Sequence, residues 1–521
     1  MTASEQLAQF AAGSKALPRL CREYKKERAT VHLKELVGGA LSFYAAAAVA
    51  KTGGVHIFVA EDRDAAAYLL NDFYNLLDEK QVYFFPSSYK RSAAYGAEDA
   101  QGVVQRTAAM NAVRGFTKGY LVVCTYPEAL AERVVDAATL QRDTIAVKLG
   151  DKISIAVLED ALADANFTRV DFVYEPGQYS VRGGIVDVFS YSESKPYRID
   201  FFGDEVDSIR RFNISSQLSA DKLDRVEIVP NLNAGEAPRV SFVQFAGSSA
   251  TCWFYDVDYV LRRVNDPRRK VLADMEEPGQ IDRLLTSRNV LLRDMAGNSV
   301  VALRDNLPER PATAAVVFDT APQPKFNKNF EMLADDMIRN SLRGYATYIL
   351  SENKVQVERL ENIFHQIGRG QAAVRSLSVT LHEGFVDNDL KLCLYTDHQI
   401  FDRYQRYRIN GEIRRDEQMT VAELNQLRPG DYVVHIDHGV GRFDGLVKIN
   451  ENGKVHEAIK LVYKDGDVLF VNVHSLHRIS RYKSGDGEPP KVYKLGNGAW
   501  QKLKNAAKKA VKDISRELIA L

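Results

Sequence analysis

The chain has 521 residues, of which 45% are hydrophobic and 26% charged, and its 69 basic side chains equal its 69 acidic ones in number. A protein of this length needs several hydrophobic cores, so we expect about three to five domains. The zero net charge excludes a general basic field for nucleic acid, so any such contact has to be local.

Residues 1–125 are predicted to form a parallel-sheet α/β domain. Short apolar runs alternate there with helical patterns, which is typical of βαβ units. The apolar runs are TVHLKELV, GVHIFVA, QVYFFP and GYLVVCT. The helical patterns are an alanine-rich segment after the first run, then AAYLLNDFYNLL and VVQRTAAMNAV.

The segment LVGGALSF, at 36–43, raises the question of nucleotide binding. A phosphate loop needs the N–H groups of a glycine turn, a lysine for the β- and γ-phosphates, and a Ser or Thr that ligates Mg²⁺. Gly38 and Gly39 can form the turn and Ser42 can supply the hydroxyl, but Leu41 stands where the lysine belongs. We therefore predict a degenerate nucleotide loop that packs a helix onto the sheet and holds neither ATP nor Mg²⁺.

Residues 126–212 are predicted to form an inserted α+β domain. The helical pattern LEDALADANF precedes a stretch with period-2 alternation that glycine and proline interrupt. FFGDE, at 201–205, has the carboxylates of a magnesium site, but the alternation before Gly203 favours a strand-turn-strand unit.

Four arginines and a phenylalanine lie on the predicted strands of this domain: Arg182, Arg198, Arg210, Arg211 and Phe202. They fit a solvated sheet face with ordinary cross-strand pairs. They equally fit an interaction hot spot, where arginine and aromatic residues are enriched.

The next segments return to α/β character. RVEIVP and VVFDT lie among helices in residues 213–335, and residues 336–410 show a β-α-β pattern of a small α/β domain, from YATYILS through KVQVERLENIFHQI to LKLCLYTDHQIF. A polar linker is expected at 411–424.

Residues 425–485 are predicted to form a small SH3-like or Tudor-like β-barrel. Asn452-Gly453 and Asp465-Gly466 lie between alternating apolar runs, the strongest local signal for hairpins. His435 and Asp437 share a strand face in this module, but no tetrahedral ligand spacing recurs, so we expect no metal.

Residues 486–521 are predicted to start one long basic amphipathic helix, in which apolar residues recur every three or four positions. The pattern stops without a glycine or proline cap, so we expect that the chain is a fragment of a longer protein. The predicted fold class is an α/β multidomain protein with a degenerate P-loop-like parallel-sheet domain, an inserted α+β domain, a small α/β domain, the barrel and this C-terminal helix.

Cysteine usage and the N-terminus indicate the compartment. Cys21, Cys124, Cys252 and Cys393 lie far apart without C-x-x-C spacing, which argues against a disulfide framework or a zinc site. No signal peptide and no apolar run long enough to span a membrane are visible, so a cytoplasmic location without membrane contact is expected. No catalytic motif is visible either.

Two groups of motifs resemble a known family. EPGQYSVRGGIVDVFSYSESKPYRIDFFGDEVDSIRRFN is similar to the second domain of UvrB, which the bacterial transcription-repair coupling factors share. LRPGDYVVHIDHGVGRFDGL, LHRISRYK and KLGNGAWQKLK resemble the RNA-polymerase-interacting domain and relay helix of that family. The resemblance extends over essentially the whole chain.

The resemblance implies an architecture and partners. Residues 1–125, 126–212 and 213–335 correspond to domains 1a, 2 and 1b of a UvrB-like module, 336–410 to a third domain, and 425–485 to the polymerase-binding module. The partners implied are UvrA and the RNA polymerase β subunit. DNA contact would belong to an ATP- and Mg²⁺-dependent translocase motor that is missing from these residues, in a bacterial cytoplasmic protein.

Individual positions carry over from the family's motifs. The UvrA-binding positions fall on Arg182, Arg198 and Phe202. The apolar polymerase contact falls on Ile449, with Leu446 nearby, on an exposed strand that can pair with the β subunit.

Two alternatives remain open at this point. One is a UvrB-like ATPase of nucleotide excision repair, which Leu41 disfavours because UvrB keeps the lysine in this loop. The other is a transcription regulator that holds polymerase through the barrel alone, and UvrA binding would distinguish it from the first interpretation.

Overall fold

The structure is a computed structural model. It describes residues 2–500 with gaps at 90–98, 215–217, 234–236, 275–278, 305–306, 308–309, 404, 406, 410–423, 425–426, 436, 452–453, 473–478, 483–489, 491, 493 and 496–499. The predicted linker at 411–424 and the predicted helix at 486–521 lie almost entirely outside the described residues. No helix in the described part of the chain is both long and apolar enough to cross a membrane.

The chain forms two compact units. The first comprises Met1–Thr144, Tyr191–Glu193 and Asn231–Glu412, and the second comprises Ile145–Ser190, Ser194–Pro230 and Ile413–Leu521. The second unit begins later than the inserted domain expected at 126–212 and continues beyond it. The reason is a long-range pairing: β6 (Ile145–Lys148) runs antiparallel to β13 (Arg225–Ile228), which local alternation cannot reveal.

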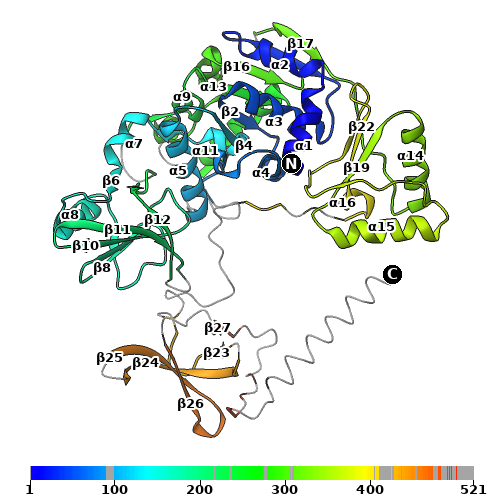
Figure 1. The fold of residues 1–521 in the computed structure, drawn as a ribbon. Helices are drawn as coiled ribbons and strands as arrows, with labels where there is room; N and C mark the ends of the chain where they lie inside the picture. Colours follow the sequence, from blue (N-terminus) through cyan, green and yellow to red (C-terminus); the bar gives the residue numbers. More distant parts are fainter. Residues whose placement is uncertain are drawn as a thin grey trace. The chain divides into compact units, whose positions relative to one another are not determined.

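A seven-stranded sheet forms the centre of the first unit, with the strand order β17-β1-β16-β15-β2-β4-β3 (Figure 1). Its strands are β1 (Thr30–Lys34), β2 (Gly54–Val59), β3 (Val82–Phe84), β4 (Tyr120–Thr125), β15 (Thr251–Phe254), β16 (Ser299–Ala302) and β17 (Ala314–Val317). All the neighbouring pairs are parallel, which confirms the predicted parallel sheet. β15 and β16 come from the segment after the insertion and separate β1 from β2.

Helices flank this sheet, and three of them lie where the alternation within residues 1–125 predicts them. The first half of the unit has α1 (Ala3–Ala12), α2 (Ala16–Tyr24), α3 (Ala40–Thr52), α4 (Arg63–Leu76), α5 (Ala100–Gly115), α6 (Pro127–Ala131) and α7 (Ala137–Asp143). The part after the insertion has α9 (Phe242–Ala246), α10 (Val257–Arg263), α11 (Asn265–Asp274), α12 (Gly279–Leu284) and α13 (Arg288–Asp294). A short pair, β5 (Val134–Val135) with β14 (Arg239–Val240), joins the two parts.

The first unit ends in a five-stranded mixed sheet with the order β18-β21-β22-β19-β20. The strands are β18 (Thr320–Pro322), β19 (Ala346–Leu350), β20 (Ser376–Leu377), β21 (Phe385–Asp387) and β22 (Leu392–Thr396), and the helices are α14 (Phe330–Leu342), α15 (Lys354–Gln366) and α16 (Asp397–Ile400). Figure 1 shows α14 and α15 beside β19 and β22, with which they share one hydrophobic core. The predicted β-α-β unit is confirmed, since β19 and β22 are parallel and α15 lies between them in the chain.

The inserted part of the second unit is a six-stranded sheet with the order β12-β11-β10-β9-β8-β7. Its strands are β7 (Thr168–Arg169), β8 (Gln178–Arg182), β9 (Ile185–Val188), β10 (Tyr197–Phe202), β11 (Glu205–Phe212) and β12 (Ser219–Leu223). α8 (Ile155–Asp164) contributes Leu158 and Leu162 to the core on one face. FFGDE is a hairpin turn between β10 and β11, as the alternation predicts, and Gly203 has φ 62°.

The C-terminal module of the second unit is a five-stranded antiparallel sheet with the order β26-β25-β24-β23-β27. Its strands are β23 (Tyr432–His435), β24 (Gly439–Glu451), β25 (Lys454–Val462), β26 (Val468–Asn472) and β27 (Ile479–Arg481). The Asp465-Gly466 hairpin is confirmed: it joins β25 to β26, and both residues have positive φ, 66° and 82°. The turn at 452–453 lies outside the described residues, and closure into a barrel stays a prediction.

Candidate partner-binding surfaces and the glycine loop

A row of charged residues crosses the inserted sheet on the face opposite α8. Direct cross-strand pairing places Arg198 between Asp187 and Arg210, and Arg210 next to Lys222. Arg210 also pairs with Asp200, one strand over. The row therefore contains three cations on three adjacent strands, of which Arg198 and Arg210 are already paired with Asp187 and Asp200.

Asp187 joins two of the predicted site residues. Its side chain is 1% exposed, and Arg198 donates to it through Nε at 2.7 Å and Nη2 at 2.8 Å, the bidentate geometry of a strong ion pair. Arg182 donates to the same carboxylate. The guanidinium groups lie over aromatic rings as well, Arg182 4.8 Å from Phe172 and Arg198 4.4 Å from Phe212. Both arginines are thus held in fixed positions.

The carboxylate of Asp187 also affects the pKa of Arg198. Hydrogen bonding to Asp187 raises the pKa of Arg198 above its ordinary value. The guanidinium therefore keeps its charge at any physiological pH.

Phe202 lies at the far end of β10, beside the turn. Its side chain is 84% exposed, the second-highest value among the large hydrophobic residues described as exposed. The structure thus brings Arg182 and Arg198 together through Asp187 and places Phe202 separately on the same hairpin. An exposed aromatic ring on the same strand as the fixed Arg198 has the composition of a protein-binding hot spot.

Sequence reasoning missed Asp187. The signal was present in IVDVF, where one carboxylate interrupts a run of residues that are otherwise apolar. A buried carboxylate requires a cation or several hydrogen bonds, and this requirement predicts a neighbouring arginine without naming which one.

Leu446 and Ile449 lie on β24 of the C-terminal module. Residues 442–451 of β24 pair with β25, whereas only 439–442 pair with β23. In the described part of the module, the second half of β24 has a strand on one side alone, so its other edge is open to hydrogen bonding. Leu446 is 44% exposed and Ile449 is partly buried.

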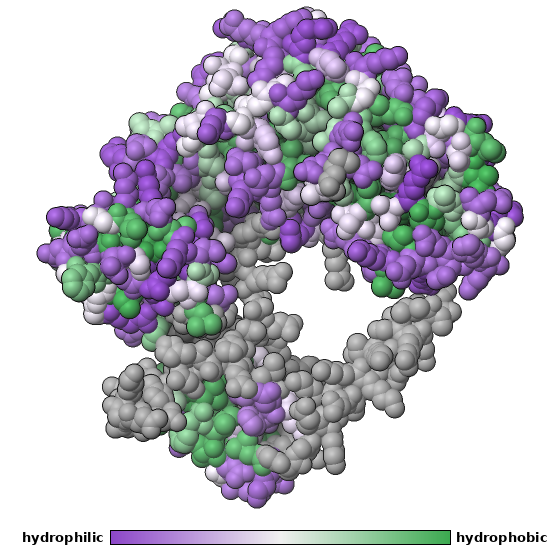
Figure 2. Space-filling view, viewed as in Figure 1, coloured by the Kyte–Doolittle hydropathy of each residue, from purple (hydrophilic) through white to green (hydrophobic). Residues whose placement is uncertain are grey.

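Hydrophobic residues gather at the surface of this module, as Figure 2 shows. Val468 and Phe470, on the edge strand β26, are 38% and 50% exposed. β25 separates these two side chains from the open edge of β24, where Leu446 is the exposed apolar residue, and an open edge of this kind can take an added strand from a partner.

The histidines of this module do not form a metal site within the described residues, where no group of three His, Cys, Asp or Glu side chains could hold an ion. His435 is buried, and its ring lies 4.8 Å from that of His438. Its Nδ1 accepts a hydrogen bond from the backbone of Asp437 at 3.2 Å.

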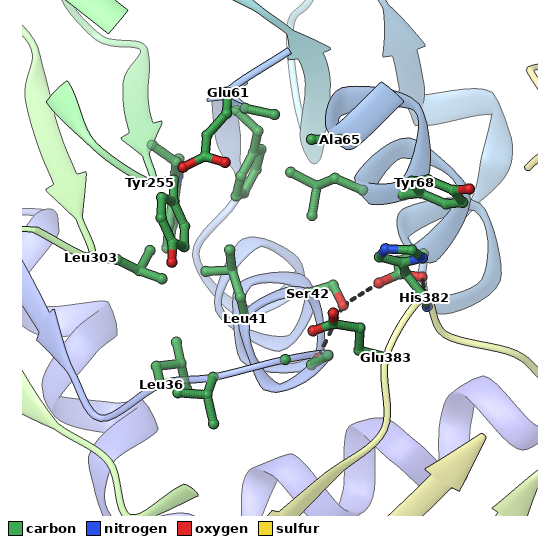
Figure 3. Close-up of a pocket in the computed structure, with 18 of the residues that line it drawn as sticks. Leu36, Leu41, Ser42, Glu61, Ala65, Tyr68, Tyr255, Leu303, His382 and Glu383 are labelled. Carbon is green, nitrogen blue, oxygen red and sulfur yellow. Dashed lines mark hydrogen bonds between the residues drawn. The ribbon is translucent and has the colours of Figure 1, made fainter. Parts of the chain in front are cut away.

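The glycine loop joins β1 to α3, which begins at Ala40 with Gly39 as its cap. Gly38 has φ 57°, a conformation that favours glycine. Ser42 is buried, and its Oγ donates to the carbonyl of Gly39 at 3.0 Å and lies 2.7 Å from Oδ2 of Asp72 (Figure 3). The hydroxyl that would ligate Mg²⁺ in a phosphate loop is therefore engaged inside the protein.

A segment of the C-terminal sheet of the first unit fills the space before the loop. A Cβ on Gly39 would lie only 2.1 Å from the carbonyl oxygen of Glu383, and one on Gly38 would lie 3.0 Å from that of Gly384. The backbone N–H of His382 donates to Asp72 at 2.7 Å. Burial raises the pKa of Asp72 to about 7, although these hydrogen bonds oppose the shift.

Two domain families match the chain. Residues 145–233 match the UvrB interaction domain, and residues 427–483 match the CarD-like/TRCF RID domain. The first match covers the sheet that carries Arg182, Arg198 and Phe202, and the second covers Leu446 and Ile449.

Curated relatives are similar over most of the chain. The transcription-repair-coupling factor of Bacillus subtilis is 24% identical over 94% of this chain and 48% of the relative. Those of Staphylococcus haemolyticus and Staphylococcus aureus strain MRSA252 are 25% and 23% identical, each over 87% of this chain and 45% of the relative. The resemblance stated from the motifs is confirmed. The chain spans about half the length of these relatives.

Proposed function

We propose that this chain, as a relative of transcription-repair-coupling factors, is a scaffold that connects stalled RNA polymerase to UvrA in nucleotide excision repair. The observation that carries the proposal is the arginine pair fixed on Asp187 beside the exposed Phe202, on a sheet that matches the UvrB interaction domain. The same chain also contains the module at residues 427–483 that matches the CarD-like/TRCF RID domain. Neither surface contains a group that would perform chemistry.

The UvrA surface is Arg182, Arg198 and Phe202. A fixed arginine loses less side-chain entropy on binding than a free one, so its contacts contribute more to affinity. The exposed ring of Phe202 adds apolar area that is withdrawn from water in the complex.

The polymerase surface is the open edge of β24 with Leu446 and Ile449. A strand of the polymerase β subunit would add to this edge through backbone hydrogen bonds, and the two apolar side chains would set the specificity.

Within this proposal, ATP hydrolysis and DNA translocation belong to a motor outside these 521 residues. The loop at Gly38 and Gly39 supports this division, since it has leucine in place of lysine and Glu383 packed against its glycines. The chain itself then holds neither ATP nor Mg²⁺. The relatives are about twice as long as this chain, which leaves room for such a motor.

The proposal is tested by titrating the full chain with UvrA and, separately, with the polymerase β subunit, while ATP hydrolysis is followed with and without DNA. Arg198→Ala should weaken UvrA binding by about 1 to 3 kcal/mol, as loss of a charged hot-spot contact does. Arg225→Ala is the matched control, because Arg225 is an exposed arginine of β13 that pairs only locally with Glu227 among its described ion pairs.

Leu446→Arg should abolish binding of the β subunit, because a charge would enter an apolar contact. Val468→Arg, which places the same charge on β26, serves as its control. DNA-stimulated ATP hydrolysis by the chain would instead favour a UvrB-like ATPase. Binding of polymerase without UvrA would favour a transcription regulator.

A further inference from the structure

A cavity of about 370 Å³ lies in the first unit beside the glycine loop (Figure 3). Its lining includes Leu41, Glu61, Asp72, Trp253, Tyr255 and Glu383. Its volume is within the range of small-molecule sites, about 300 to 1,000 Å³. The proposed partners use other surfaces, so this cavity has no role in the proposed function.

Aromatic residues form part of the cavity walls, and their rings pack on one another. The rings of Phe58 and Trp253 stack with centroids 4.9 Å apart, and the indole N–H of Trp253 donates to Nδ1 of His56 at 3.0 Å. The ring of Tyr68 stacks on His382 at 3.7 Å. Tyr255 is 41% exposed and forms part of the opening. Walls of this kind provide π faces for a flat or cationic ligand.

The charged groups around the cavity are all acidic. Glu61, Asp72 and Glu383 line it, and no lysine or arginine is among its described lining residues. Figure 3 shows Glu61 on the side of Tyr255 and Glu383 on the side of Ser42, with Leu41 between them. Of the three, Asp72 is 3% exposed and already accepts two hydrogen bonds, so Glu61 and Glu383 are the carboxylates available to a ligand.

Arg304, a cation next to the lining in sequence, is engaged with other groups. Arg304 follows the lining residue Leu303, and its guanidinium lies 5.6 Å from the ring centroid of Tyr255. It pairs with Asp256 at 3.3 Å. Arg304 therefore does not replace the lysine that a phosphate would need.

An anion is disfavoured for a second reason. The N-terminus of α3 normally offers backbone N–H groups to a phosphate, but the backbone of Glu383 is packed against Gly39, and its carboxylate oxygen lies 3.4 Å from the Cβ position of Gly38. A nucleotide would have to displace this segment and place its phosphates beside a carboxylate.

We propose that this cavity is a binding site for a small organic cation, an ammonium group on an aromatic or apolar body. The ammonium pairs with Glu61, and the body lies against Leu41 and Tyr255. Leucine at position 41, where a phosphate loop has lysine, and the Glu383 carboxylate beside Gly38 both favour a cation over an anion here.

The test uses three phenyl probes of similar shape with the full chain: phenethylammonium, 2-phenylethanol and 3-phenylpropionate. Binding is measured by ligand-observed NMR titration, with ATP as a fourth probe. Phenethylammonium should bind at least tenfold more tightly than 3-phenylpropionate, with the alcohol between them, and high salt should weaken binding of the cation alone.

Two variants locate the binding. Glu61→Gln should weaken phenethylammonium several-fold and leave 2-phenylethanol unchanged, and Glu61 is exposed, so the substitution leaves the fold intact. Leu41→Phe, which fills the cavity, should weaken both probes. Glu205→Gln, an exposed glutamate of the inserted sheet, is the matched control.

Equal binding of phenethylammonium and 3-phenylpropionate would overturn the proposal. So would phenethylammonium binding that Glu61→Gln and Leu41→Phe leave unchanged, or the absence of phenethylammonium binding up to its solubility limit. Tighter binding of ATP than of phenethylammonium would overturn it as well.

Discussion

Arg198 and Asp187 form a bidentate ion pair across neighbouring strands, with Nε 2.7 Å from Oδ1 and Nη2 2.8 Å from Oδ2. The carboxylate is buried and receives Arg182 as well. A single acid therefore positions two arginines that the resemblance assigns to UvrA binding. The ion pair on Asp187 that stabilises this sheet therefore also holds the arginines of the proposed UvrA surface in place.

Asp187→Asn should destabilise the inserted sheet by about 3 kcal/mol, because removing one partner of a buried pair leaves uncompensated charge. Hydrogen exchange of peptides covering β9 and β10 reports the opening free energy of this sheet separately from the rest of the chain. Asp207→Asn, an exposed acid on β11, is the control and should change exchange very little. Unchanged protection in Asp187→Asn would show that the arginines do not depend on it.

Phe202→Ala should change the free energy of unfolding by no more than about 0.5 kcal/mol, since an 84% exposed side chain contributes little to the core. If the proposed surface is right, UvrA affinity should nevertheless fall about tenfold or more, as for a central aromatic contact. Val157→Ala removes a 56% exposed apolar side chain from α8, on the other face of the same domain, and should not affect UvrA. Equal affinities of Phe202→Ala and the unaltered chain would remove Phe202 from the interface.

Asp72 should make the stability of the first unit depend on pH. Its folded pKa is raised from 3.8 to about 7 by burial, so the native state binds the proton more tightly than the unfolded state. Its contribution is complete below about pH 4 and is lost as the pH rises through 7. Asp72→Asn should remove this part of the pH dependence, on the order of 1 to 4 kcal/mol.

Thermal unfolding at pH 5 and pH 8 checks this expectation. Asp160→Asn, an exposed acid of α8, serves as the control. Parallel pH profiles of the unaltered chain and Asp72→Asn would show that Asp72 titrates in the ordinary acidic range.

Local patterns in the sequence were sufficient for the strands and helices from β1 to β4, but not for α1 and α2, which precede the first predicted strand. The alternation before Gly203 predicts the β10–β11 hairpin. Leu41 occupies the position at which a phosphate loop has its lysine. The order of the parallel sheet could not be predicted, because β15 and β16 enter between β1 and β2 only through pairing across the insertion.

The candidate sites show the same limit. Arg182, Arg198 and Phe202 were found through motifs, whereas Asp187, which fixes the arginines, depends on cross-strand register. His382 reaches Asp72 over 310 positions of sequence, and no local pattern contains that distance. The packing of Glu383 against Gly38 and Gly39 became visible only in three dimensions.

Gly39 provides a direct test of the packing between the loop and Glu383. Its φ of −64° is accessible to every residue, so Gly39→Ala introduces no backbone strain, although alanine is a poorer N-cap residue than glycine. The added Cβ would, however, lie 2.1 Å from the carbonyl oxygen of Glu383. Since that atom belongs to the backbone, the segment Leu381–Gly384 has to move, at a cost of about 1 to 3 kcal/mol as in other overpacked sites.

The expected result is a lower thermal midpoint for Gly39→Ala and faster hydrogen exchange in peptides around 381–385. Gly115→Ala is the matched control: it lies at the end of α5, a Cβ there meets nothing within 4 Å, and a neutral or slightly stabilising effect is expected. The contrary result is that Gly39→Ala is as stable as Gly115→Ala and that exchange near Glu383 is unchanged. In that case the segment does not pack against the loop, and the backbone N–H groups at the start of α3 are accessible to a ligand.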